Sequence, residues 1–561
     1  MTKQFEAPGK GPWELETAHF PRPLSAFMQE PLVNGFIRGF TDTMARYGTL
    51  LDHMHPAVVN GWTYQQPRAY LAPAGAMGPP PAPVLWLLTR LHPKMRARIA
   101  VGKKAIDTKQ WRRDLEQWDT VDKPAAIAKH RAIQSVDVAA LDDAALAEHL
   151  LRVETHVNEM IALHHKHTAT VIVPNGDYIA GGQEWTGASV GELLELVGGT
   201  SPISLGFAAD ELDTAGSAIR ASKAAMKALH KDRDPAQILL ALQADESAGP
   251  AVSAYIDAVQ YRSVGYDVGD PTAGEMPEQL VATLKQAATE EIGRRKPADP
   301  TAIRNRVPAE HRVDFDERLA ELQFINRLRD ERGQYSDGWG TGLARRAILE
   351  AGKRLEQREL LNSALHAPDL TCDELRSLLL TGEGPSVVDV EARYLYRTTA
   401  KIEDVPAFLN AMPSPPPPAH LLPKDARRLA IAVDAMISNL FVPSDKPNEA
   451  TVLRGLPVSP GTYVGTARIV DSPADFGKIQ QGDILVTRAT SPYFNVILPL
   501  LGAIVTDRGG QLCHAAIVAR EFGIPAVVGT REATAKITDG ATIEVDSVSG
   551  EVRIQASELV K

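Results

Sequence analysis

The segment "RGGQLCHAAIVAREFGIPAVVG", residues 508–529, sets a glycine pair, one histidine and an alanine-rich amphipathic run in close succession. The glycine pair predicts a tight turn whose backbone N–H groups can face an anion, because no Cβ atom covers them. We expect a helix from about 515 to 522, since Gly523 is typical of a helix end. "IPAVVG" then predicts a buried strand. His514 therefore stands at the mouth of a helix, directly after a glycine turn.

This position suits a histidine that accepts a phosphoryl group. The first turn of a helix favours a negative group through its N–H groups and its dipole. Neutral imidazole is a good nucleophile near pH 7, because its unperturbed pKa is about 6.5. The alternative is a structural histidine at a helix N-terminus, which the motif alone leaves open.

Sequence on both sides extends the motif. "LRGLPVSPGTYVGTARIV" (453–470) precedes it and "DGATIEVDSVSGEVRI" (539–554) follows it. Residues 453–555 as a whole resemble the phosphohistidine swivel domain of phosphoenolpyruvate-utilising enzymes. That family includes phosphoenolpyruvate synthase, pyruvate phosphate dikinase and rifampin phosphotransferase.

The resemblance implies roles for residues of the motif. It makes His514 the residue that is phosphorylated, and it makes Gly509, Gly510 and the helix start a cradle for the phosphate. Cys513 occupies a position where many members carry Ser or Thr. A thiol is a weaker hydrogen-bond donor, so the part of Cys513 in the cradle is open.

Length and composition exclude several classes of protein. A chain of 561 residues exceeds the roughly 250–300 residues at which single cores stop growing, so we expect two or more domains. The net charge of −10 argues against general binding to nucleic acid or anionic membranes. Cys372 and Cys513 form no CxxC pair, which argues against a disulfide framework or a zinc site. With neither a signal peptide nor a membrane span in the sequence, we expect a cytoplasmic protein.

Changes in amino-acid composition and predicted secondary structure along the chain divide it into three segments. Residues 1–409 are expected to form a mainly α-helical domain that binds the acceptor substrate. Residues 410–450 carry four consecutive prolines and one helix candidate at 424–441, and they predict a hinge. Residues 451–561 alternate short β-rich runs with glycines and predict a small α/β swivel domain.

The source of the phosphoryl group is expected to be a second protein. The chain has no GxxxxGK[ST] loop, and residues 85–405 are predicted helical, unlike an ATP-grasp fold. Single-chain dikinases place an ATP-grasp domain before the swivel domain, and the pyruvate-using enzymes place a substrate barrel after it. The resemblance therefore implies a separate ATP-grasp subunit that binds ATP and Mg²⁺, while we expect no metal site on this chain.

The first 440 residues are expected to bind the acceptor. "GPWELETAHFPRPLSAF" (11–27) and "LRDERGQYSDGWGTGLARR" (328–346) resemble the helical substrate domain of rifampin phosphotransferases. Such a domain joined to a swivel domain also resembles two-component phenylphosphate synthases and related kinases of aromatic hydroxyls. That resemblance rests on domain content and does not identify the substrate; the acceptor we expect is the hydroxyl of a small organic, aromatic (phenolic) compound.

A histidine stripe supplies candidates for a general base. Within 142–167, successive i+3 and i+4 steps run through His149, Val153, His156, Met160, His164 and His167, which places His149, His156, His164 and His167 along one helical stripe. A phenol benefits from a base because its pKa is about 10. The alternative is an amphipathic helix whose histidines are half-buried.

A second candidate set lies in a predicted loop at 51–71. A pocket for a small aromatic ligand requires aromatic side chains together with a few polar groups. This set supplies both: His53, His55, Trp62, Tyr64 and Arg68. Aromatic packing under a long loop is the alternative. Arg332 is a candidate for binding an anion, although most such arginines lie on solvated helix faces. His19 is interpreted first as structural, because it lies in a proline-flanked segment.

These observations predict a heteromeric dikinase-type phosphotransferase subunit that works through phosphohistidine. Two alternatives remain at this stage. One is a phosphotransferase subunit for a larger, antibiotic-like alcohol. The other is a non-enzymatic phosphocarrier or regulatory protein.

Overall fold

The computed structural model describes residues 4–17, 19–73, 75–201, 208–229, 233–289, 296–441, 448–449, 451–470, 473–490, 494 and 497–555. Contacts divide the chain into two compact units, each assembled from separate stretches. One unit, termed unit 1, contains Met1–Pro174, Gly265–Asp270 and Arg332–Val433. Unit 2 contains Asn175–Val264, Pro271–Glu331 and Asp434–Lys561. The predicted hinge and domain bounds stay a prediction, because units defined by contact do not show which parts move.

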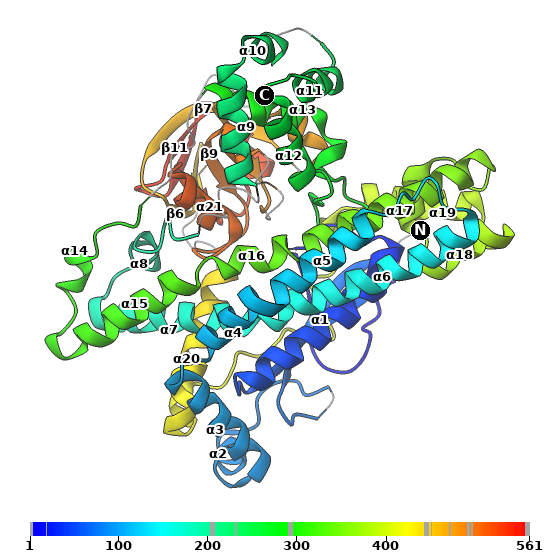
Figure 1. The fold of residues 1–561 in the computed structure, drawn as a ribbon. Coiled ribbons are helices and arrows are strands. Elements are labelled where there is room, and N and C mark those ends of the chain that lie inside the picture. Colours follow the sequence, from blue (N-terminus) through cyan, green and yellow to red (C-terminus); the bar gives the residue numbers. More distant parts are fainter. Residues whose placement is uncertain are drawn as a thin grey trace. The chain divides into compact units, whose positions relative to one another are not determined.

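Unit 1 is mainly helical. Its helices are α1 (Ala26–Arg46), α2 (Ala82–Leu91), α3 (Pro93–Asp107), α4 (Gln110–Gln117), α5 (Lys123–Gln134), α6 (Asp143–Lys166), α17 (Asp337–Gln357), α18 (Cys372–Thr381), α19 (Val387–Thr399) and most of α20 (Lys424–Phe441). Long helix α6 lies between α1 and α17 (Figure 1). The sequence predicts α6 and α17 correctly, because their apolar residues recur at helical spacing.

Close packing of α1 on α6 depends on small residues. A Cβ atom added at Gly39 of α1 would lie 2.2 Å from the carbonyl oxygen of Ala162 in α6. Helix α1 ends at Arg46, because Gly48 turns the chain with φ +59°. Residues 51–54 join a strand.

The predicted loop at 51–71 is wrong for most of its length, because the chain forms a β-hairpin there. Strands β2 (Leu51–Val59) and β3 (Trp62–Ala69) pair antiparallel through a turn at Asn60 and Gly61, both with positive φ. With β1 (Trp13–Leu15) and β4 (Phe408–Leu409) they form a sheet in the order β2-β3-β1-β4.

Unit 2 contains a helical part and a sheet. The helices wholly within it are α8 (Val190–Glu195), α9 (Ala209–Ala221), α10 (Lys223–Leu229), α11 (Pro235–Gln243), α12 (Gly249–Val259), α13 (Pro277–Thr289), α14 (Thr301–Arg304), α15 (Arg312–Ile325), α21 (His514–Phe522) and α22 (Ala533–Lys536). Two more helices cross between the units along the chain, namely α7 (Thr168–Thr186) and α16 (Leu328–Gln334).

The sheet of unit 2 lies in the C-terminal segment that the sequence predicts as α/β. Its strands are β5 (Val452–Arg454), β6 (Leu456–Val458), β7 (Thr462–Ile469), β8 (Asp483–Thr487), β9 (Leu501–Thr506), β10 (Ala526–Val528), β11 (Thr542–Asp546) and β12 (Glu551–Ile554). Their order is β5-β12-β11-β7-β8-β9-β10-β6. The central strands β7, β8, β9 and β10 are parallel to one another, and α21 crosses from β9 to β10. The prediction of a mainly helical chain with a β-rich C-terminal part is confirmed.

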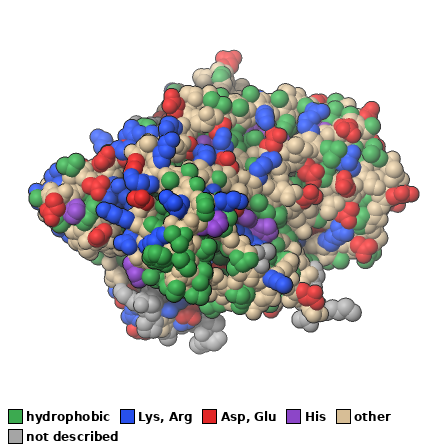
Figure 2. Space-filling view, turned by 90° about the horizontal axis from the view of Figure 1, so that it is seen from below, with side chains coloured by type: hydrophobic (Ala, Val, Ile, Leu, Met, Phe, Trp, Pro, Cys, Tyr) green, Lys and Arg blue, Asp and Glu red, His purple; other side chains and the backbone are tan. Residues whose placement is uncertain are grey.

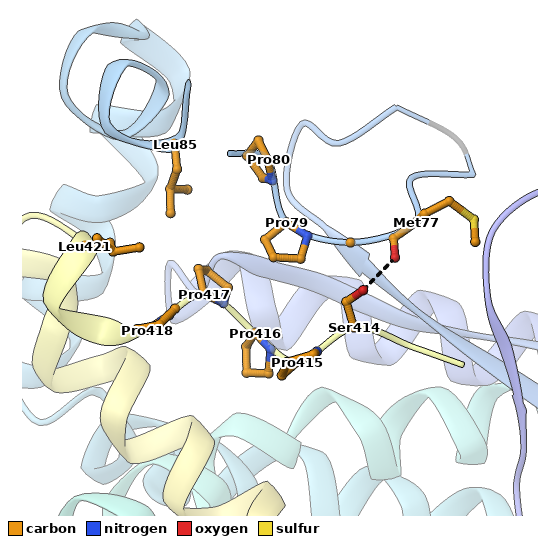
Figure 3. A pocket seen from close by; sticks show the side chains of 11 residues that line it. Met77, Pro79, Pro80, Leu85, Ser414, Pro415, Pro416, Pro417, Pro418 and Leu421 are labelled. Atoms are coloured by element: carbon orange, nitrogen blue, oxygen red, sulfur yellow. Dashed lines mark hydrogen bonds between the residues drawn. The ribbon is translucent and has the colours of Figure 1, made fainter. Parts of the chain in front are cut away.

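The proline-rich stretch packs against another segment of unit 1. Residues 414–418 and 77–80, together with Leu85 and Leu421, line an open pocket of about 550 Å³ (Figure 3). The Ser414 hydroxyl donates to the Met77 carbonyl at 3.1 Å. Prolines 415–418 are thus held on one side by residues near α2.

Helix α2 presents an apolar surface. Val84, Trp86, Leu87 and Leu91 are 44 to 62% exposed. Figure 2, which views the molecule from below Figure 1, shows hydrophobic side chains gathered on one face. None of the described helices is both long enough and apolar enough to span a bilayer.

Candidate active site

The carboxyl ends of three neighbouring parallel strands form the edge on which His514 lies. β8 runs into Arg488 and Thr490, and β9 runs into the glycine turn before α21. Backbone hydrogen bonds join the ends of β8 and β9. The Asp507 N–H donates to the Thr487 carbonyl at 3.0 Å, and the Arg508 N–H donates to the Arg488 carbonyl at 2.9 Å. Ligands of parallel sheets bind at such edges.

His514 is the first residue of α21, which begins one residue before the expected start at about 515. Cys513 is its N-cap, and Gly523 ends the helix in the left-handed conformation, as predicted. His514 Nδ1 lies 3.0 Å from the Thr490 hydroxyl oxygen. Thr490 is buried, so this bond fixes the ring at the helix N-terminus.

The two glycines of the turn differ in conformation. Gly509 has φ +107°, whereas Gly510 is not among the described glycines with positive φ. Of this pair, it is therefore Gly509 that uses the backbone region open to glycine. A Cβ atom added at Gly509 would lie 2.6 Å from Cys513 Sγ.

Cys513 packs against the turn instead of capping the helix through its side chain. No side-chain capping hydrogen bond is formed by its thiol. Burial raises the pKa of the Cys513 thiol to about 11, although N–H groups of the first helical turn and Arg520 act in the opposite direction. The thiol is therefore protonated at neutral pH and makes no charged contact with an anion.

Gly509→Ala is expected to lower the melting temperature, because a side chain at φ +107° and the contact with Cys513 together cost about 1–3 kcal/mol. The measurement is the thermal unfolding transition. Gly510→Ala is the matched control and is expected to shift the transition less. An unchanged transition in Gly509→Ala would contradict the constraint.

The residues around His514 suit a phosphate better than a metal. Arg488 and Arg508 follow the ends of β8 and β9 and bring positive charge to this edge. Arg520 of α21 donates to the Gln511 carbonyl at 2.7 Å and so holds the turn. No group of three or more His, Cys, Asp or Glu that could hold a metal ion occurs among the residues that the structure describes.

The predicted histidine stripe lies largely against α17. His149, His156 and His164 of α6 are near Arg346, Gly340 and Asp337 respectively. Each meets a different environment, so the stripe is not one pocket wall.

Two members of the stripe are deeply buried in α6. Burial lowers the pKa of both His149 and His156 to about 4. His156 Nε2 is 2.8 Å from His130 Nδ1, and the His130 ring stacks on Trp339. Both members are therefore neutral at pH 7.

His167, the remaining member, is the C-cap of α6 and faces away from α17. Its Nε2 is 2.8 Å from Asp122 Oδ2, and its ring packs edge-on against Trp118. This bond between residues 45 apart is a structural link inside unit 1.

His164 and Arg332, predicted separately, are brought together. His164 Nδ1 lies 2.9 Å from Asp337 Oδ1. Arg332 donates to the His164 carbonyl at 3.2 Å and to the Thr168 hydroxyl at 2.7 Å. Burial lowers the pKa of His164, and Asp337 partly offsets this.

Residues that the sequence analysis did not name as site candidates complete this group, among them His19, which it interpreted as structural. His19 lies near His164 and His165, and its ring contacts Tyr266 at 5.4 Å between centroids. Burial lowers the pKa of His19, but Glu16, 3.1 Å from its Nδ1, outweighs burial and leaves the pKa raised. We call His19, His164, His165, Arg332 and Asp337 the His164 cluster. The fold brings the members of this cluster together from distant parts of the sequence. A local sequence pattern could therefore not have predicted the cluster.

The hairpin gathers part of the second candidate set. His53 pairs with Arg68 across β2 and β3, and His53 Nε2 is 3.2 Å from His55 Nδ1. Asp52 Oδ2 lies 3.0 Å from His53 Nδ1. Burial first, then His53 and Arg68, lowers the pKa of His55.

Trp62 and Tyr64 lie in the core of the small sheet. Both are fully buried, in a cluster with Trp13 and Leu409. The Trp62 Nε1–H donates to Tyr396 at 3.0 Å, and the Tyr64 hydroxyl donates to the Pro406 carbonyl at 2.8 Å. Packing accounts for both side chains, in line with the packing alternative.

Comparisons with known proteins identify the C-terminal part. Residues 479–550 match the family model "PEP-utilising enzyme, mobile domain". The chain is 43% identical over 118 residues to a probable phosphoenolpyruvate synthase of Archaeoglobus fulgidus, which covers 20% of this chain and 16% of that protein. The predicted resemblance to phosphoenolpyruvate-utilising enzymes is confirmed for the mobile domain at residues 479–550.

Longer matches extend beyond this domain. Chondramide synthase cmdD of Chondromyces crocatus is 32% identical over 249 residues, or 43% of this chain and 6% of that protein. The uncharacterized phosphotransferase YvkC of Bacillus subtilis is 29% identical over 243 residues, or 43% of this chain and 27% of that protein. The chain thus spans between 6 and 27% of the length of these relatives.

Proposed function

We propose that this chain, which carries the mobile domain of phosphoenolpyruvate-utilising enzymes, is a phosphotransferase subunit that passes a phosphoryl group from His514 to a small phenolic acceptor. The observation that carries the proposal is the placement of His514 inside the matched domain, at the N-terminus of α21 and bonded to Thr490. Phosphotransferases among the similar proteins support the class of reaction.

The bond to Thr490 supports a specific reacting atom. With its proton on Nδ1, the ring donates to the Thr490 oxygen, and the lone pair for attack is on Nε2. Nε2 attacks phosphorus, a P–N bond forms, and the donor's P–O bond breaks with its electron pair going to the donor oxygen. The N-terminus of α21 and the nearby arginines stabilise the negative charge.

ATP is the proposed donor, bound with Mg²⁺ by a separate ATP-grasp subunit. By analogy with dikinases, the β-phosphoryl group goes to His514, the γ-phosphoryl group goes to water, and AMP remains. The Mg²⁺ neutralises phosphate charge on that partner. We propose that both proteins act in the cytoplasm.

The test is transfer of label from ATP to the full chain, with and without a candidate ATP-grasp partner. We expect acid-labile β-label on His514 only when the partner is present. Label in the absence of the partner would contradict the divided arrangement, and γ-label would contradict the dikinase order. Label without later transfer to any small molecule would favour the phosphocarrier alternative.

A further inference from the structure

We propose that His164 is the general base that deprotonates the phenolic acceptor, and that Asp337 is its positioning residue. This inference rests on the proposed function and adds the acceptor-side chemistry to it. His164, Asp337 and the residues that surround them lie in unit 1.

The His164–Asp337 pair has the geometry of an oriented base. His164 Nδ1 is 2.9 Å from Asp337 Oδ1, and the two side chains are only 15% and 12% exposed. A carboxylate on Nδ1 holds the Nδ1–H tautomer, so the lone pair is on Nε2. The same carboxylate stabilises the imidazolium that forms when Nε2 takes a proton.

Two elements hold this pair from outside α6. Asp337 begins α17, and the Ser336 hydroxyl lies 3.2 Å from the same Asp337 Oδ1. Arg332 of α16 donates to the carbonyl of His164 itself. The pair is therefore fixed in position by groups far apart in the sequence.

Aromatic side chains around the pair favour an aromatic acceptor. The His165 ring, 4.7 Å from that of His164, packs against Phe36 at 4.2 Å. Near His19, Tyr266 contacts both His19 and Phe20, at 5.4 and 6.0 Å. Planar aromatic surfaces near a base suit a phenol, whose ring can pack while its hydroxyl meets Nε2.

The pKa values of two neighbouring histidines, His164 and His19, are shifted in opposite directions. The pKa of His164 is lowered, mainly by burial, whereas Glu16 holds the pKa of His19 above its ordinary value. Environments that separate two pKa values are typical of acid and base partners. A neutral His164 can accept a proton, and a protonated His19, together with Arg332, can stabilise a phosphoryl group.

The step balances without a further reactant. His164 Nε2 takes the proton of the acceptor hydroxyl while the acceptor oxygen attacks phosphorus on phospho-His514. A P–O bond forms, and the P–N bond breaks with its electron pair returning to His514 Nε2. The products are an aryl phosphate, neutral His514 and protonated His164, which then releases its proton to water.

The experiment separates this step from loading of His514. The full chain is phosphorylated with phosphoramidate, a small-molecule donor to histidine, and labelled His514 is verified by peptide mapping. Phenol or benzyl alcohol is then added, and aryl or benzyl phosphate is followed by ³¹P NMR. Variants are His164→Asn, which keeps a donor for Asp337 but lacks the base, and Asp337→Asn.

We expect phenyl phosphate from the wild-type chain and a rate roughly 100- to 10,000-fold lower in His164→Asn, with unchanged loading of His514. His149→Gln is the matched control on the same helix. Both ring nitrogens of His149 lack a hydrogen-bond partner among the described residues, so normal transfer is expected.

The pH profile gives a measurement that a purely structural role would not change. The groups facing His164 are Asp337, Arg332, His19 and His165. Because the base must be neutral, phenol-dependent transfer is expected to fall as pH drops through a pKa below 6.5. Asp337 raises the pKa of His164, so Asp337→Asn is expected to move this acid limb to lower pH, besides slowing transfer.

Several results would overturn the inference. They are equal rates in wild type and His164→Asn, an acid limb that Asp337→Asn leaves in place, and transfer to benzyl alcohol but not to phenol. A loaded chain that phosphorylates neither compound would also overturn it, while leaving His514 as a carrier. Failure of His514 to load in the wild type would instead contradict the proposed function.

Discussion

His514→Ala is expected to abolish the acid-labile phosphate on this chain and to reduce overall phosphoryl transfer by roughly 10⁶-fold, the size of effect seen when an enzyme loses its nucleophile. The reason is that no second nucleophile stands at the start of α21, where the neighbours Cys513 and Ala515 are a protonated thiol and a methyl group. Labelling with phosphoramidate, followed by peptide mapping, measures the effect without any partner.

The fold is expected to survive this change. His514 is a surface-accessible first residue of α21, and alanine has the highest helix propensity. Loss of the hydrogen bond between His514 Nδ1 and the Thr490 oxygen costs about 1 kcal/mol. His420→Ala, at an exposed histidine of unit 1, is the control and should label normally. Acid-labile phosphate elsewhere in His514→Ala would contradict the assignment.

Local signals made the helix at His514 predictable. The helix ends at Gly523, whose backbone adopts the left-handed conformation with φ +66°, and glycine is the residue that adopts it most easily. The strands on both sides are short apolar runs between glycines, and each run lies within one strand of the sheet. Gly509 and Gly510 look alike in sequence, yet in the fold Gly509 is the one with φ +107° and with Cys513 Sγ 2.6 Å from the position of an added Cβ atom.

The hairpin shows why other parts escaped prediction. β2 and β3 contain Pro56 and Pro67, two histidines and two glutamines, which do not form an alternating apolar pattern. Their stability comes from packing of Trp62 and Tyr64 against residues near 400, more than 300 positions away. Such contacts carry no signal in a local window of sequence.

The acceptor-side residues were predictable only in part. Helical spacing indicated His164, because residues three and four apart share one face of a helix. Its partner Asp337 is 173 positions away, and His19 comes from a segment beside β1. The sequence thus indicated the helix face but not which of its histidines meets a carboxylate.

Thr490→Val is expected to slow phosphorylation of His514 roughly 10- to 100-fold, because valine keeps the shape of threonine but removes the oxygen 3.0 Å from Nδ1. Phosphorylation at Nε2 makes the ring a cation that carries its proton on Nδ1. A hydrogen bond to a charged group contributes about 1.5–3 kcal/mol, which sets the size of the effect. The measurement is the rate of phosphohistidine formation from phosphoramidate.

Two variants test whether the hydroxyl itself is responsible. Thr490→Ser keeps the oxygen and should recover most of the rate. Thr530→Val removes another buried hydroxyl at the same sheet edge, one that bonds the Thr506 carbonyl at 3.0 Å, and it should cost stability without slowing phosphorylation. If Thr490→Ser were as slow as Thr490→Val, packing and not proton placement would explain the loss. Wild-type rates in Thr490→Val would show that His514 reacts without its Nδ1 partner.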